Sequence, residues 1–201
     1  MNYFLRAGAY LFHPLLMPLL GVVSYYMVSP RFADPNIVAA KLLAIGILTF
    51  IVPIILFFLL KSLGAVDSIH LNTVRERRIP LMLQCLLLLL IVKLVFDPYD
   101  ETELYYFFVG ILFSALSALI LGIFKFKASL HQMGIAGVTM FLIGLSIHFE
   151  VNVLIGLSFF FIVNGWVASS RLHTESHVGS ELVVGFFLGM LPQLIMFNFY
   201  L

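Results

Sequence analysis

Charged residues are scarce in this chain. Asp, Glu, Lys and Arg together make up only 10% of the 201 residues, whereas hydrophobic residues make up 62%. A soluble domain typically carries about 25% charged residues. The sequence therefore excludes a soluble globular domain, because too little polar surface exists to cover one, and it places the chain in a lipid bilayer.

Cysteine and metal-binding motifs are also nearly absent. The single Cys85 excludes an internal disulfide, and its apolar neighbours predict a buried thiol rather than a reactive one. No CxxC motif, HExxH motif or carboxylate cluster suggests a metal ion. The net charge is only +1, so nucleic-acid binding is not expected.

Long apolar runs fill most of the sequence. A spanning helix needs about 20 mostly apolar residues, and its backbone must satisfy its own hydrogen bonds in lipid. We expect an all-α, polytopic transmembrane helical bundle of six to seven spans, forming one transmembrane domain over residues 1–201. His13 interrupts the first run and His148 the fifth, and both are expected to form hydrogen bonds in the core. The apolar windows cover residues 7–29, 37–60, 79–96, 104–124, 131–149, 153–169 and 181–201.

The basic residues gather on one side if these windows alternate across the bilayer. Side A, as we call it, holds the N-terminus and the connections 61–78, 125–130 and 170–180. Side B holds the connections 30–36, 97–103 and 150–152. Eight of the eleven basic residues then lie on side A. The positive-inside rule explains this bias without any function and makes side A cytoplasmic. The histidines on side A carry no such signal, and they favour a functional site: His70, His131, His173 and His177.

One segment on side A carries a specific motif. Ser170 and Arg171 are followed after five residues by His177, and Glu181 comes four residues later. Residues four apart on a helix share a face, so the carboxylate can bind one imidazole N–H and leave the other nitrogen free as a nucleophile. The spacing resembles the third signature of the type 2 phosphatidic acid phosphatase superfamily, with Glu181 where that family has Asp. The resemblance implies that His177 is the nucleophile, Glu181 orients it and Arg171 binds phosphate.

A second segment resembles the PSGH box of the same superfamily. Ser129 and His131 keep the spacing of the box, with Ala128 and Leu130 in place of its Pro and Gly. Ser129 and Gln132 also form an S-x-x-Q capping box, which predicts a helix start whose free N–H groups attract phosphate on side A. The resemblance implies that His131 is the general acid and that Ser129 donates a hydrogen bond to the phosphate.

The first signature of the superfamily, K-x6-RP, is only partly present. Arg78 lies two residues before Pro80, and it is our first candidate for a further phosphate-binding cation, with Arg75 as the second. Lys125 or Lys127, beside the second box, can replace the missing Lys. The alternative for each is an interfacial cation that reaches toward the head groups.

The resemblance covers residues 125–192 well and implies a superfamily-like core at about 75–201. It implies a membrane phosphatase of the bacterial inner membrane, acting on a lipid phosphomonoester or lipid pyrophosphate through a phosphohistidine, without a metal or other cofactor. The departures at Ala128, Leu130 and the first signature leave open a non-catalytic membrane subunit or a lipid-binding protein. A small transporter has less support, because no inverted pair of broken segments is present. Many bacterial members of the superfamily act on the outer side of the inner membrane, whereas the charge bias favours the cytoplasm.

Overall fold

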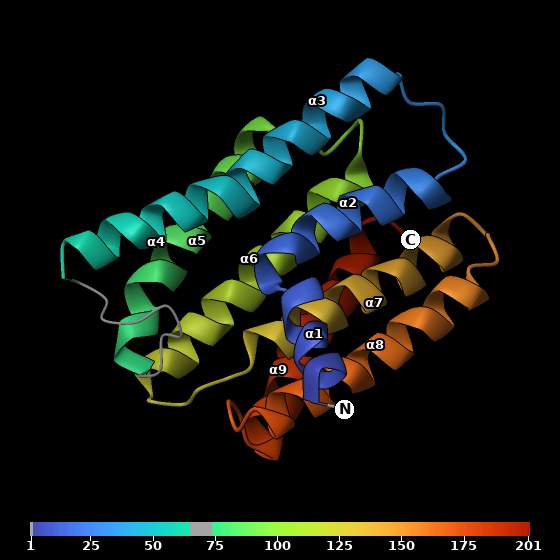
Figure 1. The fold of residues 1–201 in the computed structure, drawn as a ribbon. Coiled ribbons are helices and arrows are strands. Elements are labelled where there is room, and N and C mark those ends of the chain that lie inside the picture. Colours follow the sequence, from blue (N-terminus) through green and yellow to red (C-terminus); the bar gives the residue numbers. More distant parts are fainter. Residues whose placement is uncertain (1, 65–73) are drawn as a thin grey trace.

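The computed structural model describes residues 2–64 and 74–201, with the side chains of residues 2, 74 and 75 outside the description. All regular structure in these residues is helical, so the expected all-α class is confirmed. Successive helices run up and down along a common direction, and their connections gather at the two ends of the bundle (Figure 1). The helices in chain order are α1 (Asn2–Leu11), α2 (Met17–Val28), α3 (Pro35–Gly46), α4 (Val52–Ser62), α5 (Val74–Leu94), α6 (Thr102–Ile123), α7 (Leu130–His148), α8 (Leu154–His173) and α9 (Gly179–Met196).

Several of these helices are long and apolar enough to cross a membrane. Five candidate spans meet this requirement among the described residues, and α3 and α4 together form one of them, Pro35–Ser62. The bent pair α1 and α2 makes a sixth if it counts as one span. The α5 helix is outside this group, and its first turns carry Arg77 and Arg78, which shorten its apolar stretch. The helices therefore fit an integral membrane protein, with five or six candidate spans where the sequence predicted six to seven.

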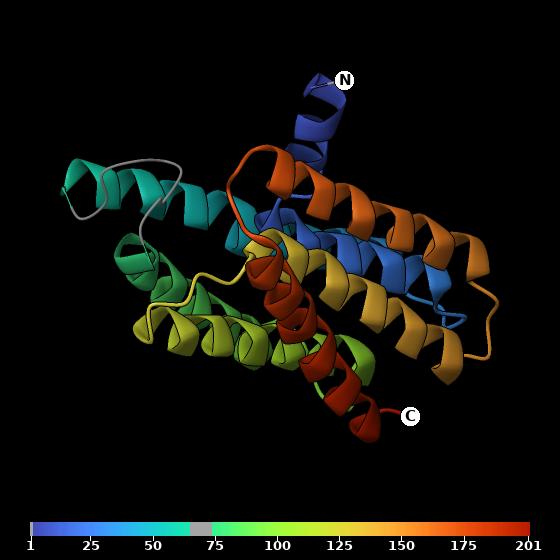
Figure 2. The same cartoon turned by 90° about the horizontal axis from the view of Figure 1, so that it is seen from below.

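The first helix is broken at His13. Pro14 begins the short 3-10 turn η1 (Pro14–Leu16), where a missing N–H does no harm, and the chain bends by 40° between α1 and α2. As Figure 2 shows, α1 leaves the line of α2 and projects from the bundle. The indole of Trp166 on α8 stacks on Phe4 at 4.7 Å and donates to the Phe4 carbonyl at 3.0 Å. These contacts fix α1 against α8.

Two glycines bring α9 onto α7. A Cβ at Gly185 would lie 2.6 Å from the Ser129 carbonyl oxygen, and one at Gly189 would lie 2.0 Å from the Met133 carbonyl oxygen. Only a hydrogen atom fits at either position, because a Cβ would meet a backbone carbonyl oxygen, which cannot move aside as a side chain can. Both glycines therefore allow close helix packing. The crossing sets the start of α9 beside the start of α7, and the Ser129 N–H donates to the Glu181 carbonyl at 3.1 Å.

Polar side chains close the bundle on side B. The buried Glu103 carboxylate pairs with Arg31 at 2.9 Å and with His148 at 2.7 Å, and the Tyr25 hydroxyl lies 3.4 Å from it. The expectation that His148 forms a hydrogen bond in the core is thus confirmed, although its partner is a carboxylate. Next to this group, Glu101 pairs with Lys41 and accepts a hydrogen bond from Tyr26 at 2.6 Å. We call these seven residues the side B cluster.

Candidate functional site

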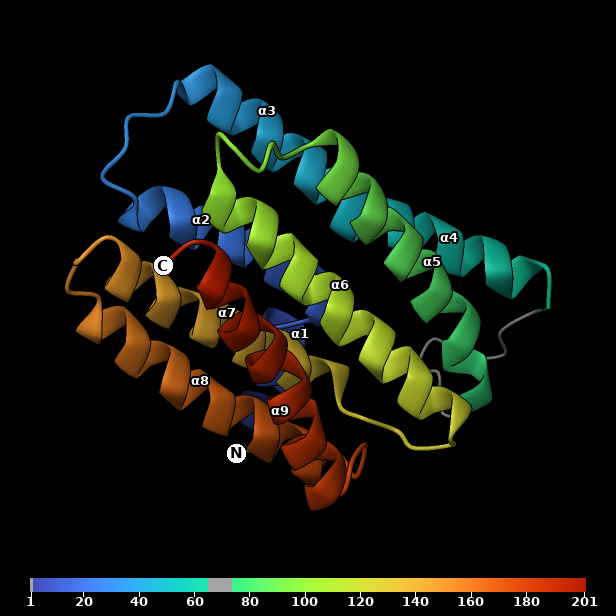
Figure 3. The ribbon, with the colours of Figure 1, turned by 180° about the vertical axis from the view of Figure 1, so that it is seen from behind.

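A second polar group lies at the opposite end of the bundle. The α6–α7 and α8–α9 connections and the start of α5 all lie toward this end (Figure 3). Lys127 reaches the carbonyl of Ser176, His177 contacts Glu181, and the rings of His13 and His131 meet. The charges of Arg77 and Arg171 act on members of this group. We call this group the side A cluster: His13, Arg77, Lys127, His131, Arg171, His177 and Glu181.

Two tight turns, one after α8 and one after α6, determine the paths of the loops that carry this cluster. Helix α8 ends in a turn in which Glu175 has φ +51° and the Ser176 N–H donates to the Arg171 carbonyl at 3.1 Å. Lys125 has φ +64° at the corresponding place after α6. Lys127 then reaches across, and its ammonium donates to the Ser176 carbonyl at 3.1 Å. The two loops are therefore joined directly beside His177.

His177 and Glu181 form the contact that their spacing predicts. The Nδ1 of His177 lies 2.6 Å from Glu181 Oε2, and only 1% of the His177 side chain is exposed. Glu181 also accepts the Val178 N–H at 3.4 Å, at the start of α9, where the helix dipole favours a negative charge. In the neutral imidazole, Nδ1–H donates to the carboxylate. The lone pair of Nε2 is then free to attack an electrophile.

The electrostatics of the loop keep His177 neutral. Burial lowers the pKa of His177 to about 4, although the hydrogen bond to Glu181 opposes this effect. The positive charges of Arg77 and Lys127 lower the pKa of His177 further. Burial and the neighbouring charge of Arg77 also lower the pKa of Lys127, with a smaller effect from Arg171. A neutral imidazole beside several cations is suited to attack an anionic substrate.

Arg171 is close enough to two histidines of the cluster for its charge to act on them. Its charge acts on both His13 and His131, and the charge of His177 also acts on His131. The Nε of Arg171 is buried without a hydrogen-bond partner among the described residues. A buried donor without a partner is costly, and an anion at this place would satisfy it.

The neighbouring arginines on α5 differ in their contacts. Arg78 donates to the carbonyls of Gly122 and Ile123 at 3.2 and 3.3 Å, where it closes the end of α6. Arg77 is the arginine whose charge acts on His177 and Arg171. The charge of Arg77 therefore makes it a further candidate beside Arg78, which stays a prediction from the sequence. The side chain of Arg75 lies outside the described part of the structure, as does His70.

Ser129 begins α7 as the sequence predicts. Its hydroxyl accepts the Gln132 N–H at 3.5 Å, and the residue is fully buried. The predicted capping box is only half formed, because the Gln132 side chain donates instead to Asn164 at 3.0 Å. Ser129 therefore acts as an N-cap, and its proposed contact with phosphate stays a prediction.

The hollow beside the cluster is narrow. Arg77, Lys127 and Ala128 are among the residues that line it, and its volume of about 10 Å³ suits a single water molecule. A phosphate group does not fit in a hollow of this size.

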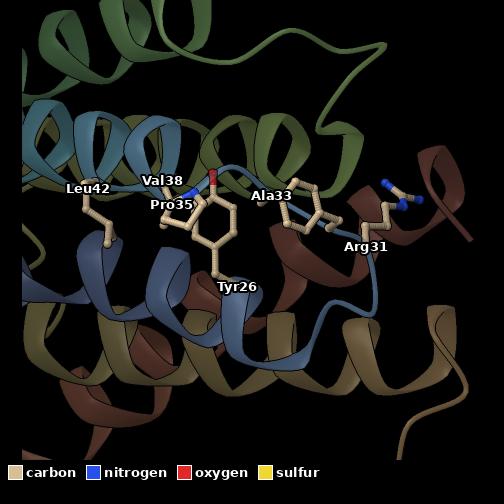
Figure 4. Close-up of a pocket in the computed structure, with 8 residues that line it drawn as sticks. Tyr26, Arg31, Ala33, Pro35, Val38 and Leu42 are labelled. Carbon is tan, nitrogen blue, oxygen red and sulfur yellow. The ribbon is translucent and has the colours of Figure 1, made fainter.

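A wider hollow of about 480 Å³ lies far from this cluster, between α2 and α3 (Figure 4). Its lining is mostly apolar, and its two polar side chains, Tyr26 and Arg31, already contact Glu101 and Glu103. The guanidinium of Arg31 points away from the hollow (Figure 4). We interpret this hollow as a gap between helices at the lipid surface rather than as a substrate site.

His13 and Arg77 join the site without having been proposed for it from the sequence. His13 forms a hydrogen bond as expected, because its Nδ1 accepts the Leu15 N–H at 3.4 Å, and its ring also meets that of His131, with centroids 5.2 Å apart. The break at His13 and Pro14 was the only sequence signal for it. Among the described residues, no group of three His, Cys, Asp or Glu side chains is placed to hold a metal ion.

No family model, curated protein or solved structure matches this chain. The two motif spacings and the geometry of the side A cluster are therefore the indications of function in this chain.

Proposed function

We propose that the protein is a membrane phosphatase that hydrolyses a lipid phosphomonoester or a lipid pyrophosphate through a phosphohistidine. The observation that carries the proposal is the contact of His177 with Glu181 beside the cations Arg77, Lys127 and Arg171. Transfer of a phosphoryl group depends mainly on positioning and on stabilising negative charge. The side A cluster offers both a positioned nucleophile and positive charge.

In the proposed first step, Nε2 of His177 attacks phosphorus and the bond from phosphorus to the leaving oxygen breaks. His131 donates a proton to that oxygen, so the product leaves as an alcohol or a lipid phosphate. Arg77 and Arg171 would bind the equatorial oxygens. In the second step, water attacks phosphorus, His131 accepts its proton, and inorganic phosphate and free His177 result.

A lipid substrate is favoured by the surroundings of His177. Val178, the next residue, is 60% exposed, and the exposed apolar side chains of Val183 and Phe187 continue along α9. A phosphate head group at the helix ends would leave its hydrocarbon tail beside this apolar surface. We further propose the bacterial inner membrane as the location, with side A toward the cytoplasm because of the charge bias.

A second candidate is a non-catalytic, lipid-binding membrane protein or subunit with the same architecture. The narrow hollow and the burial of His177 favour it, because a substrate has little access to the nucleophile. This candidate predicts binding of lipid phosphate without turnover.

The test is phosphate release by the purified protein in micelles. Substrates are phosphatidic acid, lysophosphatidic acid, an isoprenyl pyrophosphate and the water-soluble p-nitrophenyl phosphate. Wild type is compared with His177→Asn and with the control His173→Asn, which changes an exposed histidine at the end of α8. The proposal predicts release by wild type and by His173→Asn, and loss in His177→Asn. Equal release by all three proteins would contradict it, and binding without release would support the second candidate.

A further inference from the structure

The hinge between α1 and α2 lies directly on the first turns of α7. His13 is the N-cap of η1, and its Nδ1 accepts a backbone N–H of that turn at 3.4 Å. Gly134, one turn after His131, leaves space for the hinge. A Cβ there would lie 2.7 Å from Met17 Cγ and 3.7 Å from Pro14 Cα. The break in the first helix is therefore seated at a fixed place beside His131.

Two groups from the N-terminal segment contact the His131 ring. The rings of His13 and His131 meet edge to face, with centroids 5.2 Å apart and planes at 84°. A backbone hydrogen bond joins His131 to Ala9, the last buried residue of α1 before the hinge. The anchoring of α1 on Trp166 holds Ala9 in place. The orientation of His131 thus depends on a segment far from the motifs in sequence.

We propose that His13 is a positioning residue for His131: its ring keeps the His131 ring turned toward the phosphate site for proton transfer. The kinetic part of this inference rests on the proposed phosphatase function, whereas the ring contact does not. The Nδ1 of His13 is occupied by the η1 turn, so the neutral ring carries its proton on Nε2. The hydrogen bond from the Leu15 N–H therefore fixes the orientation of the His13 ring. The fixed ring restricts the positions that the His131 ring can take.

Two substitutions separate the cap from the ring. His13→Asn keeps a good N-cap but removes the ring, and His13→Phe keeps a ring but removes the cap. We expect His13→Asn to lower kcat by about tenfold to a hundredfold with KM changed less than about twofold, because a misplaced catalytic group costs rate. We expect His13→Phe, whose ring has lost the cap that fixes it, to lose less of kcat than His13→Asn and to unfold at a lower temperature.

Two kinetic results would overturn the proposal. The first is a wild-type kcat in His13→Asn, which would show that the ring has no influence on the reaction. The second is a loss of orthovanadate affinity in both variants, which would make His13 a phosphate ligand rather than a positioning residue.

A measurement without turnover tests the ring contact separately. In protein labelled with ¹⁵N-histidine in micelles, His13→Asn should shift or broaden the ring signals of His131 and leave those of the exposed His173 unchanged. His13→Phe should shift the His131 signals less than His13→Asn does. Unchanged His131 signals in His13→Asn would refute the inference. A wild-type protein that releases no phosphate would refute the proposed function, while the His131 signals would still decide the ring contact.

Discussion

The two ends of the bundle hold their charges in opposite ways. On side B, each carboxylate of the cluster faces a cation: the buried Glu103 pairs with Arg31 and His148, and the partly buried Glu101 pairs with Lys41. On side A, the charges of Arg77, Lys127 and Arg171 oppose one another, with Glu181 as a nearby carboxylate. In the side B cluster the charges neutralise one another, and the ion pairs join neighbouring helices. The buried Nε of Arg171 has no hydrogen-bond partner among the described residues, and a bound anion would satisfy it, so side A is suited to hold an anionic ligand.

The largest effect on the rate of phosphate release is expected at Glu181, which contacts His177, and not at Glu103, which contacts His148. Glu181→Gln should lower phosphate release by about a thousandfold, because an amide no longer selects the Nδ1–H tautomer of His177 or stabilises its positive charge. Glu103→Gln, the matched change on side B, should leave release within about twofold of wild type. The measurement is the initial rate with the best lipid phosphate. A large loss in Glu103→Gln would mean that the side B cluster takes part in the reaction.

The next effect compares the adjacent arginines of α5. Arg77→Gln should lower phosphate release by about a hundredfold, as expected for the loss of one charge that stabilises the transition state. Arg78→Gln should have little effect on the rate, because Arg78 binds the carbonyls of Gly122 and Ile123. Steady-state kinetics of both variants check this. If the order of the two losses is reversed, Arg78 leaves α6 when the substrate binds.

This arginine pair shows where prediction from the sequence stopped. The sequence predicted the helical class and which side of the bundle the arginines belong to, and the spacing of His177 and Glu181 predicted their contact. Neighbouring positions on a helix differ by about 100° in direction, so sidedness alone does not tell Arg77 from Arg78. His13 belongs to no motif, and it reaches His131 only because Gly134 accepts the hinge. Both residues depend on tertiary packing, which the local pattern does not encode.

A smaller effect concerns stability. Glu103→Gln should lower the free energy of unfolding by about 2 kcal/mol, because a buried carboxylate with charged partners is lost while the half-exposed Arg31 can regain water. His177→Asn should change the free energy of unfolding less at pH 7. Denaturant unfolding in micelles measures both. Equal losses in the two variants would remove the distinction between a structural cluster and a ligand site.

The smallest effect is on the pH dependence of stability. The pKa of His177 is about 4 in the folded protein, against 6.5 for an ordinary histidine. Between these values the unfolded chain binds more protons than the folded one, so this contribution to stability is full above pH 6.5 and is lost as the pH falls toward 4. His177→Asn should therefore lose less stability than wild type between pH 7 and pH 5. Parallel losses in the two proteins would show that burial does not perturb His177.

The contrast between the two ends is tested most directly by anion binding to the resting protein. Titration calorimetry with orthovanadate, a phosphate analogue, needs no turnover and compares wild type with Arg171→Gln on side A and Arg31→Gln on side B. We predict one equivalent bound by wild type and by Arg31→Gln, and affinity at least about tenfold weaker in Arg171→Gln. Undiminished binding in Arg171→Gln, or a loss in Arg31→Gln, would contradict the assignment of side A as the phosphate site.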